Sequence, residues 1–316
     1  MKLVFCGTPR FAVPTLEALL AAGHEIALVV SQPDRPVGRA QQLAAPPIKQ
    51  VALAAGLAVT QPEKIRNNTE FRAQLEAIAP EAIVVVAYGR ILPPSMLALP
   101  RLGCINLHAS LLPKYRGAAP IQWAVAMGET FTGNTTMLLE EGLDTGPILL
   151  QRALAIGPEQ TAADLFEELA IGGAPLVVET LAGLADGSLR PQPQNHTGAT
   201  LAPILTREDG RMGFAAHTAA ELKNRWRGFQ PWPGAFTALD GKKLIVHHLA
   251  VADASAFTAP ASAQPGEILV EDHRFLVVCA GNTWLELVEI QLEGKKRMAA
   301  ADFLRGMQFT AGKRLG

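Results

Sequence analysis

The sequence predicts an α/β fold for its first part and a smaller β-rich domain for the rest. Strand and helix patterns alternate up to about residue 188, and the composition then changes at a proline-containing polar segment. Short strands separated by turns follow that segment. Repeated strand–helix units imply a mostly parallel, Rossmann-like sheet with helices on both sides.

Short apolar runs and helical patterns supply the elements of the first domain. The run Ala82–Ala87 is wholly apolar, as a strand covered on both faces requires. The other expected strands are Lys2–Cys6, Glu25–Ser31, Ala58–Thr60, Cys104–His108 and Thr135–Leu139. Helices are expected over Val13–Ala22, up to Ala55, over Glu70–Ile78, and as one or two helices over Ala162–Gly183. A polar loop is expected from Gln32 to about Pro46.

The composition divides the chain into a catalytic domain over residues 1–188, a linker over 189–207 and a second domain over 208–316. The second domain is predicted to begin with a helix over Phe214–Trp226. Its short strands favour a small β-barrel of the OB type. The expected strands are Ala235–Ala238, Leu244–Leu249, Gly266–Val270, Phe275–Cys279 and Trp284–Ile290.

Composition and charge narrow the class of protein. The 316 residues are 49% hydrophobic and 18% charged, which is typical of globular proteins. A net charge of −1 argues mildly against a nucleic-acid partner, although the C-terminal third is slightly basic. Neither a signal peptide nor an apolar run long enough to span a bilayer is apparent. The scattered Cys6, Cys104 and Cys279 indicate reduced packing cysteines in a cytosolic protein.

The first strand is followed by Gly7-Thr8-Pro9, which invites a dinucleotide-binding interpretation. The glycine fingerprint of such sites is absent, because no further glycines stand at the required offsets. A dehydrogenase is therefore disfavoured, and we expect this loop to line a pocket at the carboxyl ends of the strands.

Two polar side chains occupy one predicted strand. Asn106 and His108 are two residues apart, so they project from the same face, roughly 7 Å apart along the strand. Satisfied core polar groups are the alternative interpretation. The position of the pair at the carboxyl end of the strand, before Ser110–Pro113, favours a functional site.

A carboxylate completes the candidate site. Asp144 lies between Gly142 and Gly146, where the backbone can bend tightly, although a simple turn-forming aspartate would look the same. An amide, an imidazole and a carboxylate suit acyl transfer to an amine: the imidazole takes the proton of the amine and the amide stabilises the oxyanion. Neither a nucleophile elbow nor metal-ligand spacing is present, which favours direct transfer without a covalent intermediate or metal.

The stretch Leu102–Gly117, "LGCINLHASLLPKYRG", followed by "AAPIQWA" and "GLDTG", resembles the formyltransferases that use 10-formyltetrahydrofolate. The resemblance implies three catalytic residues: Asn106, His108 and Asp144. It also implies a folate pocket formed by two segments, whose residues are Ser110, Leu111, Leu112 and Pro113, and Ala87, Tyr88, Gly89, Ile91 and Leu92.

Three further stretches resemble the methionyl-tRNA formyltransferases within that family. They are "SQPDRPVGR" at 31–39, "FQPWPGAF" at 229–236 and "GKKRMAAADFLRG" at 294–306. In that family the first is an insertion loop that enters the acceptor end of initiator tRNA, so the resemblance implies that Arg39 binds tRNA. The lysines that often follow this arginine are replaced by Ala40-Gln41-Gln42, which predicts weaker attraction to phosphates.

The resemblance thus implies a monomeric cytoplasmic transferase acting in translation initiation. It would move the formyl group of 10-formyltetrahydrofolate, a co-substrate, to the α-amine of methionyl-initiator tRNA, without a metal. Two alternatives stay open: a sugar-nucleotide N-formyltransferase, and a noncatalytic RNA-binding protein on the same fold.

Overall fold

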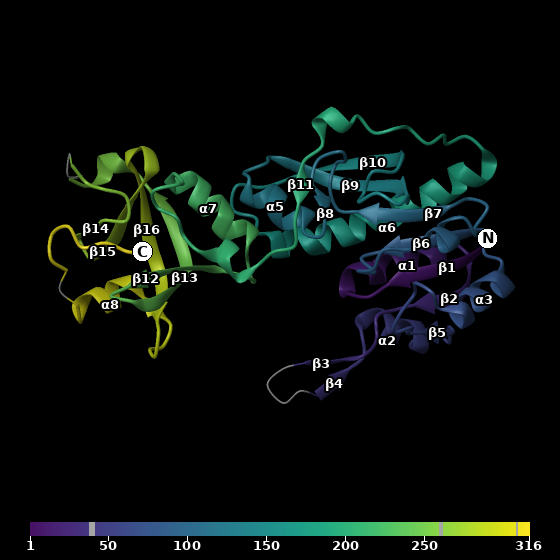
Figure 1. The fold of residues 1–316 in the computed structure, drawn as a ribbon. Coiled ribbons are helices and arrows are strands. Elements are labelled where there is room, and N and C mark those ends of the chain that lie inside the picture. The colour runs from purple at the N-terminus through teal and green to yellow at the C-terminus, as the bar shows by residue number, and fades with distance from the viewer. Residues whose placement is uncertain (38–41, 259–261, 308) are drawn as a thin grey trace. The chain divides into compact units, whose positions relative to one another are not determined.

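The computed structural model describes residues 1–316 apart from 38–41, 259–261 and 308 (Figure 1). The chain forms two compact units. The first comprises Met1–Ile121, Phe131–Ile156 and Asp164–Ile204. The second comprises Gln122–Thr130, Gly157–Ala163 and Leu205–Gly316. Two short segments that precede residue 164 therefore group with the C-terminal part, and the domain boundaries expected near 188 and 208 stay predictions.

The first unit is built on one seven-stranded sheet with the order β10-β9-β7-β6-β1-β2-β5 (Figure 1). The strands are β1 (Lys2–Gly7), β2 (Glu25–Val30), β5 (Val59–Thr60), β6 (Ala82–Val86), β7 (Cys104–His108), β9 (Phe131–Leu138) and β10 (Ile148–Ala155). The pairings β5-β2-β1-β6-β7 are all parallel, and β9 and β10 continue the sheet with antiparallel pairings. The predicted mostly parallel sheet is confirmed.

Helices cover this sheet. They are α1 (Val13–Ala21), α2 (Pro47–Ala54), α3 (Thr69–Ile78), α4 (Pro94–Leu97) and α6 (Ala162–Asp186). Most of α5 (Pro120–Ala126) groups with the second unit. Side chains of α3 and α4 share one core with alternate residues of β1 and β6, such as Val4 and Ile83. The intervening β1 residues face the opposite way, because strand side chains alternate between faces. α6 packs beneath β7 and β9, where Leu107 lies against Gly173.

The long helix α6 is, within the described ranges, the one helix long and apolar enough to cross a membrane. Length and composition are weak grounds by themselves, because core helices of soluble proteins have the same properties. Two contacts tie α6 to the sheet. The Thr136 and Thr180 hydroxyls lie 2.7 Å apart, and Asn134 Nδ2 donates to the Leu169 carbonyl at 2.9 Å. α6 is therefore a core helix of the first unit in this structure.

Some elements differ from the sequence prediction. The expected polar loop contains an antiparallel hairpin, β3 (Arg35–Val37) and β4 (Gln42–Ala44), which Figure 1 shows extending from the body of the first unit. β10 was not predicted, because its sequence ILLQRALA consists mainly of good helix formers. Its strand conformation comes from pairing with β9. In both places cross-strand contacts outweigh local propensity.

The second unit contains an antiparallel sheet with the order β12-β13-β16-β15-β14, and β17 pairs with β16. Its elements are α7 (Ala219–Gly228), β12 (Ala235–Leu239), β13 (Lys242–Ala252), β14 (Ile268–Glu271), β15 (Arg274–Cys279), β16 (Thr283–Leu292), β17 (Met298–Ala299) and α8 (Ala300–Arg305). The β-rich prediction is confirmed. None of the pairings between the described strands joins β12 to β14, so closure into a barrel stays a prediction.

The helix α7 begins five residues later than the predicted start at Phe214. Thr218 caps it in a reciprocal capping box: the threonine hydroxyl accepts from the Glu221 N–H, and the glutamate side chain accepts from the Thr218 N–H. Phe214 instead lies in the core of the second unit. Phe214 therefore packs in the core and does not begin the helix.

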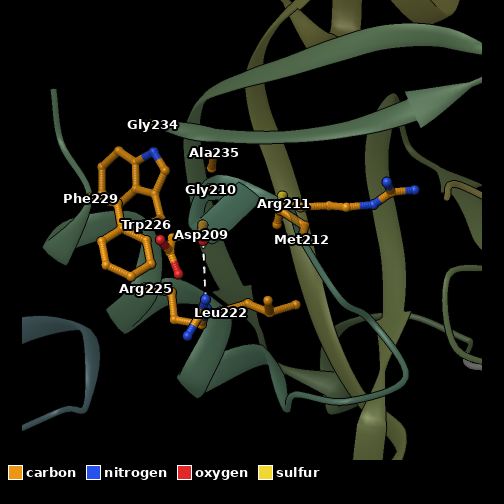
Figure 2. A pocket seen from close by; sticks show the side chains of 10 residues that line it. All are labelled: Asp209, Gly210, Arg211, Met212, Leu222, Arg225, Trp226, Phe229, Gly234 and Ala235. Atoms are coloured by element: carbon orange, nitrogen blue, oxygen red, sulfur yellow. Dashed lines mark hydrogen bonds between the residues drawn. The ribbon is translucent and has the colours of Figure 1, made fainter. Parts of the chain in front are cut away.

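A small pocket lies between α7 and the beginning of β12 (Figure 2). Arg225 reaches across it, donating to the Asp209 carbonyl at 3.0 Å. The same guanidinium lies over the Phe229 ring at 5.0 Å, a cation–π contact. Burial lowers the pKa of Arg225 from its ordinary value. The Arg225 guanidinium therefore stabilises the packing of α7 within the second unit.

The three cysteines are buried and unpaired, as predicted. Burial raises the pKa of the Cys104 and Cys279 thiols to about 12. The thiolate form that reacts with electrophiles or binds metals is therefore suppressed. These residues act as small apolar side chains in the cores.

Candidate active site

The candidate site lies on one face of the sheet, at the carboxyl end of β7. Asn106 pairs in register with Val85 of β6 and with Met137 of β9. Leu107 points toward α6, so Asn106 and His108 project from the opposite face. The carboxyl ends of β6 and β7 lie side by side, which brings the segment after Ala87 next to these two side chains.

His108 is almost fully buried, with an exposed fraction of 5%. Its Nε2 lies 2.9 Å from the carbonyl oxygen of Tyr115. A carbonyl only accepts, so Nε2 carries the proton and the lone pair of the neutral ring is on Nδ1. Nδ1 lies 3.7 Å from Asp144 Oδ2, which is ion-pair distance and too long for a hydrogen bond.

Asp144 occupies the loop between β9 and β10, with a positive φ of 50°. Its Oδ2 accepts a 2.8 Å hydrogen bond from the Gly117 N–H. The ring of His108 is therefore oriented by Tyr115, and Asp144 is oriented by Gly117. The carboxylate faces Nδ1 as a nearby negative charge.

The side-chain amide of Asn106 differs from its neighbours. It is half-buried, and it forms no hydrogen bond with any residue that the structure describes. Polar side chains at such depth normally find a partner. The amide is therefore free to donate to a group bound beside His108.

The two segments predicted to bind folate meet at this edge of the sheet. In the first, Ala87, Gly89 and Ile91 are exposed, whereas the side chains of Tyr88 and Leu92 are buried in the core with α3 and α4. The Tyr88 carbonyl already accepts hydrogen bonds from Thr8 and Gln32. This segment therefore presents its alternate residues and their backbone to the site.

The second segment, Ser110–Pro113, is held by hydrogen bonds within the loop and from β9 and β10. Ser110 Oγ donates to the Lys114 carbonyl at 2.6 Å. The Leu112 N–H donates to Thr135 Oγ1 at 3.1 Å, and Gln151 Nε2 donates to the Leu112 carbonyl at 2.9 Å. Sequence reasoning missed Thr135 and Gln151, because their roles depend on the antiparallel pairing of β9 with β7 and β10.

The segment predicted to be a linker contacts the site directly. Within it, β11 (Leu201–Ala202) pairs in parallel with β8 (Arg116–Gly117), and Thr200 Oγ1 accepts from the Tyr115 N–H at 2.9 Å. Gln194 donates to the carbonyls of Asp144 and Gly146. The composition of the segment 189–207 does not indicate these contacts, because proline and polar residues are typical of linkers.

The predicted tRNA-binding residue Arg39 lies outside the described residues. Lys49 donates to both carboxylate oxygens of Asp34, the residue before β3, and to Gln61 Oε1. The hydrogen bonds from Lys49 and then Gln61 lower the pKa of Asp34. Gln32 accepts a 2.9 Å hydrogen bond from Arg90, which extends this network toward the segment Ala87–Leu92 that is predicted to bind folate.

The chain matches the Formyl transferase family over residues 1–181 and the Formyl transferase C-terminal domain over residues 204–308. It is 65% identical to a methionyl-tRNA formyltransferase of Acidobacterium capsulatum, over 100% of both chains. The chain belongs to the methionyl-tRNA formyltransferase family. It is therefore a formyl-transferring enzyme. A relative from Koribacter versatilis is 58% identical over 100% of this chain and 99% of the relative.

Solved structures share this fold at low identity. An N-formyltransferase from Helicobacter canadensis, solved in complex with folinic acid and dTDP-3-aminofucose, is 17% identical with a TM-score of 0.64, covering 91% of this chain and 98% of that one. A sugar 3N-formyl transferase solved in the presence of dTDP and 5-N-formyl-THF has a TM-score of 0.66 at 16% identity, over 94% of this chain and 99% of that one. Both similarities concern the fold alone.

Proposed function

We propose that this enzyme transfers the formyl group of 10-formyltetrahydrofolate to the α-amine of methionine esterified to initiator tRNA. The observation that carries the proposal is the convergence of a free amide, a buried imidazole and a carboxylate at the end of β7. Nδ1 of His108 faces Asp144 at 3.7 Å, and the Asn106 amide has no partner among the described residues. These are the groups that direct acyl transfer to an amine requires.

His108 is the proposed proton acceptor. Because Nε2 is occupied by the Tyr115 carbonyl, the proton of the attacking amine passes to Nδ1. The negative charge of Asp144 stabilises the resulting imidazolium. The same proton is then available to the nitrogen that leaves as the new amide bond forms and the old one breaks. Protons therefore balance without an external acid or base.

Asn106 is the proposed oxyanion donor. As the amine attacks the formyl carbon, negative charge develops on the formyl oxygen, and a preformed donor stabilises that charge. Removal of one such donor typically costs roughly 3–4 kcal/mol in the transition state. An amide without an internal partner suits this role because no existing hydrogen bond has to break.

The folate is proposed to bind along Ser110–Pro113 and Ala87–Leu92. In the first, Leu111 and Pro113 keep partly exposed side chains, while Ser110 and Leu112 hold the loop in shape. In the second, Ala87, Gly89 and Ile91 offer the accessible surface. The folate supplies the formyl group, and the chain supplies a rigid rim that positions the formyl carbon between Asn106 and His108.

The acceptor is proposed to be recognised by two parts of the chain. Arg39 contacts the acceptor end of the tRNA, and the C-terminal unit contacts its backbone. Trp232 is 55% exposed between two prolines, which leaves its ring available for stacking on a base. The identity of this chain to methionyl-tRNA formyltransferases over its full length supports this acceptor. We further propose that the enzyme acts as a monomer in the cytoplasm.

The test compares formylation rates on charged initiator and elongator methionine tRNAs, for wild type, Arg39→Ala and a control, Arg72→Ala, on the exposed surface of α3. We expect a strong preference of wild type for the initiator, loss of that preference in Arg39→Ala, and no change in Arg72→Ala. Equal rates of wild type on both tRNAs would contradict the proposed selectivity.

An amino-sugar nucleotide is the control acceptor, because sugar N-formyltransferases share this fold. Activity of this chain on an amino-sugar nucleotide, with none on methionyl-tRNA, would contradict the proposed acceptor. Failure of folate-dependent turnover on methionyl-tRNA would contradict the proposed donor or the proposed acceptor.

A further inference from the structure

Gln194 is a buried side chain in the segment 189–207, which has the composition of a linker. Its exposed fraction is 6%, although the residues on both sides of it are exposed. Its Nε2 donates to the Asp144 carbonyl at 2.9 Å and to the Gly146 carbonyl at 2.7 Å. Its Oε1 accepts from Arg116 Nη2 at 2.6 Å and Nε at 3.2 Å. Both donors and both acceptor positions of this amide are therefore used.

The turn that Gln194 holds is the one that carries the proposed catalytic carboxylate. Asp144 has a φ of 50°, a conformation that a residue other than glycine adopts at a cost. The Asp144 and Gly146 carbonyls both point to the same amide, which fixes the peptide group that follows Asp144 and the one that follows Gly146. The left-handed turn is thus held by a side chain from a segment 50 residues away.

The other end of Gln194 reaches the strand that orients the same carboxylate. Arg116 precedes Gly117 in β8, and the Gly117 N–H donates to Asp144 Oδ2. The contacts therefore form a closed ring: from the Asp144 carboxylate to Gly117, along the backbone to Arg116, through Gln194, and back to the Asp144 carbonyl. Arg116 also contacts Nδ1 of His196 at 3.0 Å, which ties the ring to the same segment a second time.

We propose that Gln194 is a positioning residue for Asp144. The segment 189–207 would then help to hold the active site in shape. The inference rests on the proposed function of Asp144 beside His108. Gln194 keeps the carboxylate at its distance from Nδ1, and it does so through the backbone of the turn. A glutamate has no donors for the two carbonyls, and an asparagine is one methylene too short to span from Arg116 to the turn.

The test measures kcat, KM and the pH dependence of kcat for Gln194→Ala and Gln194→Glu. The glutamate variant retains the acceptor for Arg116 and loses both donors to the turn, so it isolates the positioning contact. We expect kcat to fall about 10- to 100-fold with KM for methionyl-tRNA within two-fold, because a misplaced group costs rate more than binding. We also expect the pH profile of kcat to differ from that of wild type, since the distance between the Asp144 carboxylate and Nδ1 of His108 changes.

Gln192→Ala is the matched control. Its side chain is exposed and, among the residues that the structure describes, bonds only to the Arg190 carbonyl. Its backbone pairing with Ile148 does not depend on the side chain. We expect wild-type kcat and wild-type pH dependence. A loss in this control equal to that in the Gln194 variants would mean that any change in the segment disturbs the site, and would overturn the inference.

The double variant Asp144→Asn/Gln194→Ala decides whether Gln194 acts through Asp144. If it does, the double variant is no slower than Asp144→Asn alone, whereas multiplicative losses would overturn the inference. A lower Tm with unchanged kcat and pH profile in the Gln194 variants would also overturn it. If Asp144→Asn itself retains the full rate, the proposed function of Asp144 fails. If Asp144→Asn is inactive and Gln194→Ala retains the full rate, only the inference about Gln194 fails.

Discussion

Nε2 of His108 lies 2.9 Å from the carbonyl oxygen of Tyr115, so the proton of the neutral ring is on the nitrogen remote from Asp144. Tyr115 itself has a positive φ of 61°, and its N–H is held by Thr200. A backbone group therefore selects the tautomer of the proposed base. The lone pair is left on Nδ1, beside the carboxylate.

This geometry predicts the tautomer that can be observed in solution. In the neutral form of His108, we expect the ¹⁵N chemical shifts of the ring to report a protonated Nε2 and an unprotonated Nδ1. The exposed His273 is the internal reference. A neutral form of His108 protonated on Nδ1 would contradict the proton path proposed through that atom.

Asn106 is expected to affect the rate and not the stability. Asn106→Ala should lower kcat by about 10²- to 10³-fold, because one oxyanion donor is lost. Thermal unfolding should change little, since the amide bonds to no described residue. The contrasting variant is Thr135→Val, which removes the hydroxyl that holds Ser110 and Leu112 and should lower Tm. A large loss of Tm in Asn106→Ala would indicate a structural amide.

The affinity for tRNA is expected to depend only weakly on salt. Arg39 is followed by Ala40-Gln41-Gln42, and the whole chain carries a net charge of −1. The slope of log affinity against log salt falls by up to about 0.9 for each phosphate neutralised, so few contacts give a shallow slope. Titration of tRNA binding between low and moderate salt measures it. Replacing Ala40-Gln41-Gln42 with lysines should steepen the slope, and a steep slope in wild type would be at odds with this view.

Two adjacent glycines of α6 should respond in opposite directions to alanine. A Cβ on Gly172 meets nothing closer than 3.9 Å, so Gly172→Ala should stabilise the helix by up to about 1 kcal/mol. A Cβ on Gly173 would lie 2.6 Å from Leu107 Cδ2, so Gly173→Ala should destabilise by about 1 kcal/mol or more and displace the strand residue between Asn106 and His108. Denaturant unfolding and kcat of both variants test the pair. Equal stabilities would argue against close packing of α6 on β7.

The Asp34–Lys49 contact should make stability depend on pH in the acid range. The hydrogen bonds from Lys49 and Gln61 lower the pKa of Asp34 in the folded protein, whereas the unfolded chain has the ordinary value near 3.8. A depressed carboxyl pKa contributes stability that is present above the unfolded value and is lost as pH falls through the folded value. Tm of Asp34→Asn should therefore decline less than that of wild type below about pH 4. Parallel declines of the two proteins would count against this contribution.

The sequence by itself determined the parallel sheet, the β-rich second part and the same-face placement of Asn106 and His108. These follow from periodicity and composition, which are local properties of the chain. The long composite stretch Leu102–Gly117 also led to the family that the comparisons confirm. The hairpin β3–β4 and the strand β10 were not predicted, because pairing with a partner strand decided them against local propensity.

Only the tertiary structure decided how the site is held. Tyr115 selects the nitrogen of His108, Gly117 orients Asp144, and Gln194 closes the ring from a segment whose composition indicates a linker. Each of these contacts depends on a backbone carbonyl or N–H, or on a partner far away in the chain. Backbone groups are identical in every residue, so no pattern of side chains reveals which of them will meet until the chain is folded.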